Sequence, residues 1–111
     1  MYFDCGDIFD IKAVNITYPI RISDAIDIVS DLYIELSTSL INKIFSNENI
    51  ALEPQKDDDA TYSLWRDEED YRIDWSADAS SIKRKIDSVG RPYSGASSSV
   101  GSRVLRIYSA S

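Results

Sequence analysis

The side chains best suited to recognising a substrate are two tryptophans and an arginine in one short segment. Trp65 and Arg66 are neighbours, and Trp75 follows an Ile-Asp pair. An aromatic ring can stack on a planar group while an arginine pairs with phosphate, so Trp65 and Arg66 are candidates for binding a nucleotide-linked substrate. The structural alternative, which we favour for Trp75, makes the tryptophans core residues and pairs Arg66 with the surrounding carboxylates.

Acid–base chemistry has a narrow choice of groups because the chain contains no histidine. Proton transfer near neutral pH would depend on carboxylates, tyrosines, lysines or Cys5. Residues 4–8, Asp-Cys-Gly-Asp-Ile, form an acidic turn, although such acids also simply make turns before a strand. The run Asp57–Asp59 lacks the alternating ligands and the glycine of a calcium loop, so we expect no metal site.

Several segments stand in the order typical of one enzyme family. They are the turn at residues 2–8, a long helix, the stretch Ala60–Arg66, the Ile73–Trp75 triplet, a second helix, and the Pro92–Ala96 turn. In this order they resemble the C-terminal half of the catalytic region of a folate-dependent formyltransferase. The resemblance runs from residue 2 to about residue 108, and ordered elements are far more specific than an Asp-x-Gly-Asp turn alone.

The resemblance implies a reaction and a catalytic residue. In the family, a formyl group moves from N10-formyltetrahydrofolate to an amine, and an Asn, a His and an Asp share the proton transfers. The family's Asp falls on Asp4, with Gly6 and Asp7 matching the turn and Cys5 standing where Thr is usual. A carboxylate there would orient the imidazole and accept proton density as the amine attacks. The family's Asn and His would precede Met1, so neither is assigned.

The resemblance also suggests which amine is formylated. Family members present the Pro-Tyr-x-Gly-Ala turn near the acceptor, so Tyr93 becomes a substrate-binding candidate and Gly95 a turn residue, although such residues also simply make a turn. The segment from Tyr62 to Trp75 looks most like the sugar N-formyltransferases. The expected acceptor is therefore the amine of a nucleotide-linked amino sugar. The alternatives are a fragment of a methionyl-tRNA-type formyltransferase and a non-catalytic acidic module that binds a partner or self-associates.

The elements that must position these residues predict an α/β fold. The resemblance makes it a fragment of a Rossmann-like formyltransferase domain with the order strand, long helix, strand, helix, strand. Residues 10–18 are rich in β-branched types and predict a strand. A helix should run from about Asp24 to Phe45 with Ser23 as its N-cap, followed by a connector over residues 46–59. The apolar residues of this helix recur at steps of three and four and form one stripe: Ala25, Ile28, Val29, Leu32, Leu36, Leu40 and Ile44.

The second half of the chain predicts a strand from about Thr61 to Arg66, then a short helical turn or a loop. Ser76 is the expected N-cap of a second helix, which Gly90 ends. The inward stripe of that helix is Ala79, Ile82, Ile86 and Val89. A serine-rich bend through Gly101 should lead into a final strand from Arg103 to Tyr108, with Leu105 and Ile107 facing inward.

These elements divide the chain into two predicted parts. Residues 1–50 would be the end of the formyltransferase catalytic domain, and residues 51–111 would hold the connector, the Trp-Arg strand, the second helix and the terminal strand. So few strands leave the sheet faces hard to cover, so we expect a fragment of a longer enzyme. Identical chains that pair through the long helix would also complete the layers, and we therefore predict a homo-oligomer.

The charge balance restricts the partners. The chain of 111 residues carries 19 acidic and 12 basic residues, a net charge of −7, which repels nucleic acid and anionic lipid. The basic run of Lys83, Arg84 and Lys85 points in different directions on a helix and is interpreted as a solvated face. No apolar run approaches the roughly 20 residues that span a bilayer, and no signal-peptide pattern is present. With a single cysteine, these features predict a cytoplasmic protein. The small-molecule nucleotide-sugar substrate is what the resemblance implies.

Overall fold

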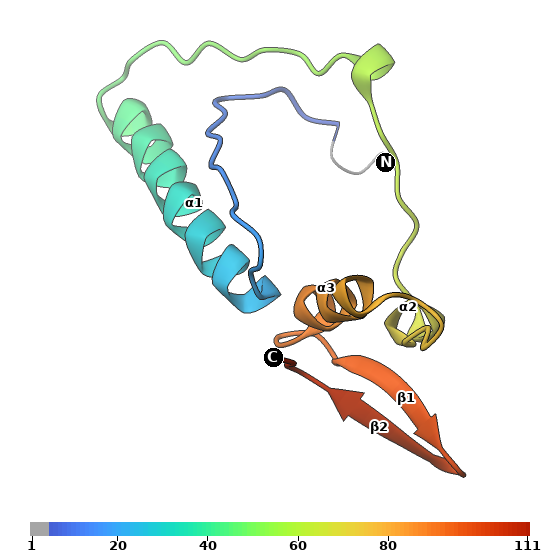
Figure 1. Cartoon of the computed structure of the whole chain (residues 1–111). Helices are drawn as coiled ribbons and strands as arrows, with labels where there is room; N and C mark the ends of the chain where they lie inside the picture. The colour runs from blue at the N-terminus through green and yellow to red at the C-terminus, as the bar shows by residue number, and fades with distance from the viewer. Residues whose placement is uncertain (1–4) are drawn as a thin grey trace. The chain divides into compact units, whose positions relative to one another are not determined.

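The computed structural model describes residues 5–111. The elements are α1 (Ile22–Phe45), the 3-10 turn η1 (Asp57–Asp59), α2 (Glu68–Tyr71), α3 (Ala79–Val89), β1 (Ala96–Val100) and β2 (Arg103–Ile107) (Figure 1). This mixture of helices with a two-stranded antiparallel sheet confirms the α/β class. The predicted Asp4 lies outside the described residues.

The chain divides into two compact units. Unit 1 contains residues 1–15 and 29–63, and unit 2 contains residues 16–28 and 64–111. The helix α1 contributes its first residues to unit 2 and the rest to unit 1. The predicted division at residue 50 concerns family domains rather than these units and stays a prediction.

Unit 1 is organised by contacts along α1. The Lys43 ammonium lies 5.2 Å from the centre of the Phe9 ring, and Lys12 forms an ion pair with Glu35. The segment after Phe9 therefore runs antiparallel to α1. Backbone hydrogen bonds of 2.7 and 2.8 Å join Ile8 to Glu53 in both directions.

The N-terminal half of the chain corrects two predictions. Residues 10–18 form no strand, because a strand needs a hydrogen-bonded neighbour and the described part of unit 1 pairs only through the single bridge between Ile8 and Glu53. The long helix is confirmed, but it begins at Ile22, so Ser23 lies in its first turn rather than at the N-cap. None of its residues is buried.

Unit 2 holds the hydrophobic core. β1 and β2 pair from Ala96 with Ile107 to Val100 with Arg103, and α3 lies beside this hairpin (Figure 1). The buried apolar side chains are Ile73, Ile86, Val89 and Ala96, with Tyr71, Ile82, Ile107 and Ala110 packed against them. The other edge of β1 is joined by the segment before α3, because the Ile73 N–H donates to the Ser97 carbonyl over 2.9 Å.

Several predictions for this half are wrong in detail. The predicted strand from Thr61 to Arg66 does not form, since Arg72 and Ile73 occupy the edge of β1 instead. The serine-rich stretch predicted as a bend is the strand β1. Its partner β2 confirms the final strand, yet the side chain of Leu105 is exposed rather than inward. The α3 helix is confirmed, but its N-cap is Asp78, whose carboxylate accepts the Ser81 N–H over 3.1 Å.

The turn between α3 and β1 requires glycine at one position. Gly95 has a φ of +84°, and a Cβ added there would lie 2.9 Å from Cε1 of Tyr108. The backbone therefore passes directly against the Tyr108 ring. The Arg91 guanidinium lies 4.7 Å from the centre of the same ring.

Candidate ligand-binding site

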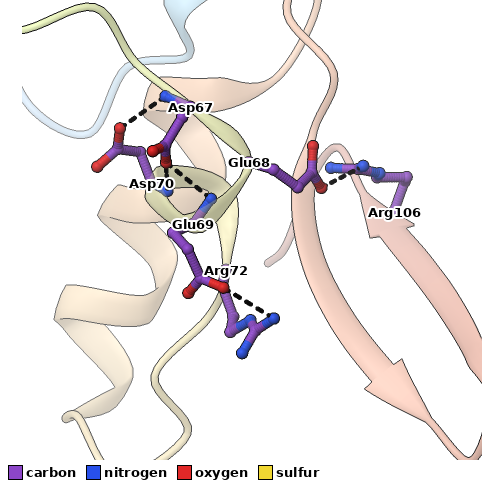
Figure 2. Close-up of polar contacts among 6 residues, drawn as sticks. All are labelled: Asp67, Glu68, Glu69, Asp70, Arg72 and Arg106. Carbon is purple, nitrogen blue, oxygen red and sulfur yellow. Dashed lines mark hydrogen bonds and ion pairs between the residues drawn. The ribbon is translucent and has the colours of Figure 1, made fainter.

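The acidic stretch after Arg66 forms the short helix α2 by capping itself. Asp67 is the N-cap, and its carboxylate accepts the backbone N–H groups of Glu69 and Asp70 over 2.9 and 3.4 Å. The Asp70 carboxylate in turn accepts the Asp67 N–H over 2.8 Å, as Figure 2 shows. This reciprocal capping box employs both aspartates in holding the helix start.

The two glutamates of α2 have arginine partners of their own. Glu68 pairs with Arg106 of β2, and Glu69 pairs with Arg72 over 3.0 Å (Figure 2). The first pair ties α2 to the hairpin. All four acidic side chains that follow Arg66 are therefore engaged with other groups.

Arg66 is held by aromatic rings instead. Its guanidinium carbon lies 5.9 Å from the centre of the Tyr71 ring and 5.5 Å from that of the Tyr93 ring. Within the described part of the chain it forms no ion pair. The expectation that Arg66 pairs with nearby carboxylates is thus wrong, because capping and the other arginines have taken them. A guanidinium on two rings keeps its N–H donors available for an anion such as phosphate or carboxylate.

The other predicted aromatic residues behave differently from one another. Trp65 is 99% exposed, next to the equally exposed Leu64. Trp75 is 61% exposed and donates its Nε1–H to the Ser98 hydroxyl over 2.9 Å. The prediction that Trp75 is a core residue is therefore wrong. The indole N–H of Trp75 instead binds Ser98 of β1. The Tyr93 side chain is partly exposed, and its ring contacts the Arg66 guanidinium.

Trp65 and Arg66 line an open cavity of about 1360 Å³ within unit 2. The α3 side of this cavity presents Lys83, Arg84 and Lys85. The interpretation of these three as a solvated face holds for Arg84, which is exposed, but not for the other two: Lys83 pairs with Asp87 over 2.7 Å and Lys85 donates to the Asp70 carbonyl over 2.7 Å. Sequence reasoning missed Asp87, although its spacing of four residues from Lys83 is the signal for an ion pair on one helix face.

Two carboxylates before α3 have lowered pKa values. Hydrogen bonds from the Ser76 hydroxyl and backbone N–H hold the pKa of Asp74 below its ordinary value. Hydrogen bonds from Ser81 and Ser80, with a smaller contribution from the charge of Arg84, lower the pKa of Asp78. The N-cap of α3 is therefore ionised at neutral pH and complements the positive end of the helix dipole.

The part of the chain that begins at Arg66 and continues through α2, α3 and the hairpin has a known counterpart. Residues 66–111 match the family model of the formyl transferase C-terminal domain. This formyl transferase match covers less than half of the chain and supports membership of the formyltransferase family. None of the curated proteins compared with the chain matches it.

The predicted catalytic turn lies apart in the sequence from the formyl transferase match. Gly6 and Asp7 belong to unit 1, where both are exposed and the Gly6 carbonyl accepts Nε2–H of Gln55 over 2.7 Å. Their predicted roles beside Asp4 stay predictions. Among residues 5–111, no helix has the length and apolar character needed to cross a membrane. In the same residues, no group of acidic or cysteine side chains is placed so that it could hold a metal ion.

Proposed function

We propose that the chain is part of an N-formyltransferase that uses N10-formyltetrahydrofolate and a nucleotide-linked amino sugar. The amine nitrogen of the sugar bonds to the formyl carbon while the bond from that carbon to N10 breaks, and the proton lost by the amine passes to N10. Two lines support this proposal. The formyl transferase match supports the reaction class, and the contacts of Arg66 are the basis for the proposed acceptor class.

The observation that carries the acceptor class is Arg66 on the rings of Tyr71 and Tyr93 without a carboxylate partner among the described residues. Phosphate is the ligand group that suits a rigid guanidinium fork. Trp65, exposed beside it on the same cavity, offers a face on which a nucleobase stacks. An arginine and an aromatic ring in one cavity fit a nucleotide better than they fit an uncharged acceptor.

Asp4 is the proposed catalytic residue and would orient the base that takes the proton from the amine. The overall charge of −7 disfavours a tRNA acceptor, whose phosphates need a basic surface. A non-catalytic binding module is the second candidate, and one observation favours it: α1 is a long helix on which no residue is buried.

Binding measurements on the purified chain of 111 residues test the acceptor class. Isothermal titration with UDP-glucose, dTDP-glucose and GDP-mannose should show that at least one of them binds. Arg66→Met should weaken that binding about 10- to 100-fold, the effect of losing a charge-assisted hydrogen bond. Arg72→Met is the matched control, because Arg72 pairs with Glu69 outside this cavity. Equal losses in both variants, or no binding by any of the three, would overturn the proposed acceptor.

A further inference from the structure

The same cavity is lined by a carboxylate that takes no part in the proposed nucleotide contacts. Asp87 of α3 lines the cavity, and its side chain is 7% exposed. One carboxylate oxygen, Oδ2, accepts the Lys83 ammonium over 2.7 Å. The other oxygen, Oδ1, is buried and has no hydrogen-bond partner among the described residues. Buried acceptors are almost always satisfied, so an orphaned oxygen on a residue that lines the cavity requires a donor that the described residues do not supply.

The charges around this oxygen restrict what the donor is. A phosphate would be repelled by the Asp87 carboxylate, and an ammonium would be repelled by Lys83 beside it. A neutral hydroxyl suits both, because it donates to a carboxylate and accepts from an ammonium. Lys83 uses one N–H on Asp87 and is 37% exposed, so it has donors left for a second hydroxyl.

The geometry of an aspartate allows this contact without a change in the backbone. Rotation about the bond to the carboxylate carbon is soft, so the carboxylate can turn Oδ1, which is buried in this conformation, toward a ligand in the cavity. The pair at positions 83 and 87 lies on one face of α3, one helical turn apart. Carboxylate and ammonium thus offer an acceptor and a donor at neighbouring points of the cavity wall.

We propose that Asp87 and Lys83 form a sugar-binding subsite in which Asp87 accepts an O–H of the acceptor sugar and Lys83 donates to an adjacent hydroxyl. This inference rests on the proposed function, because it places the sugar of a nucleotide-linked substrate in the cavity that Arg66 lines. Asp87 would then distinguish sugars by their hydroxyl groups, while Arg66 and Trp65 bind the nucleotide part.

The experiment removes hydroxyl donors from the ligand and leaves the protein unaltered, so its result does not depend on whether a variant folds. The unaltered chain is titrated with the nucleoside diphosphate, with its hexose conjugate, and with conjugates in which fluorine replaces one hydroxyl at a time. Fluorine cannot donate a hydrogen bond. The hexose conjugate should bind more tightly than the diphosphate, and one fluorinated analogue should lose about 10- to 100-fold in affinity.

Asp87→Asn completes a double-mutant cycle with that analogue, and Asp70→Asn, also on the cavity, is the matched control. In Asp87→Asn the parent conjugate should bind weakly and the analogue should lose nothing further. If the diphosphate binds through Arg66 but the hexose adds no affinity, or every analogue loses equally in both proteins, the subsite is wrong while the nucleotide site stands. If neither the diphosphate nor any conjugate binds, the proposed function fails together with the subsite.

Discussion

The two units differ in what they bury, although both contain a well-formed helix. In unit 2, α3 presents Ile86 and Val89 to the hairpin, and both side chains are almost fully buried. In contrast, none of the residues of α1 is buried, including those in unit 1. The formyl transferase match covers α3 and the hairpin and stops short of α1. An apolar stripe therefore predicts that a helix forms, but the presence of a core depends on what else the chain supplies.

The largest expected effect concerns the proposed catalytic turn at residues 4–8, which should matter for chemistry rather than for packing. In the proposed full-length enzyme, Asp4→Asn should lower kcat by about 10²- to 10⁴-fold, the range for losing a positioned acid–base group, while folding is unchanged. Steady-state kinetics with thermal unfolding as the companion measurement decide this. Unchanged turnover would show that Asp4 is a plain turn residue.

The 111-residue chain alone should show no formyl transfer, since it contains no histidine.

A pair of truncations tests the contrast in burial directly. Ile86→Ala removes a side chain that is 3% exposed in unit 2 and should lower the free energy of unfolding by about 2–5 kcal/mol. Leu36→Ala on α1 should lower it by less than about 1 kcal/mol, because that position is only partly covered. Urea denaturation followed by circular dichroism measures both. Similar losses at the two positions would show that α1 has a packed face in solution.

The apolar stripe of α1, which is only partly covered, leads to a prediction about assembly. Leaving several apolar side chains in water costs about 1.5–3 kcal/mol for each. We therefore propose that the isolated chain forms a homo-oligomer through α1, and that Leu36→Glu dissociates it. Thr38→Glu adds the same charge on the opposite face, which carries the exposed Ile34 and Ile41, and dissociation by this variant alone would place the contact on that face instead. A compact monomer at micromolar concentration in sedimentation velocity would instead favour a self-contained module.

The smallest expected effect concerns acid. The folded-state pKa of Asp78 lies below the ordinary value of 3.8, so its contribution to stability is complete above that pH and is lost as the pH falls through the folded-state pKa. Asp78→Asn keeps a capping acceptor and should flatten the acid dependence of the thermal midpoint. Asp58→Asn in η1, remote in sequence from α3, is the control and should not. An unchanged acid profile in Asp78→Asn would assign the acid sensitivity to other carboxylates.

The sequence predicted helices better than strands for a physical reason. The stripes of α1 and α3 depend on local spacing, which the sequence displays. Strands depend on a partner, so β-branched residues 10–18 stay unpaired while the serine-rich Ala96–Val100 becomes β1 through its pairing with Arg103–Ile107. In each case tertiary pairing overrode local preference.

The candidate site was predictable only in part. Trp65 and Arg66 were identified by residue type, and the contact of Arg66 with Tyr93 joins two positions that the sequence singled out separately. Among residues 5–111, Arg66 has no carboxylate partner because of where the α2 acids point. The capping box of Asp67 and Asp70 was not predicted, although their spacing of three residues is its signal. The partners of Glu68 and Glu69 needed the structure.

The environments of the two tryptophans supply an optical readout. Trp65 is 99% exposed at the cavity, while Trp75 is tethered to Ser98 by its indole N–H. The chain contains no third tryptophan. The tryptophan emission of a Trp75→Phe variant would therefore come only from Trp65, and a nucleobase stacked on that ring would quench it. The side chain that is proposed to stack on the ligand would then report occupancy of the cavity in real time, without a label.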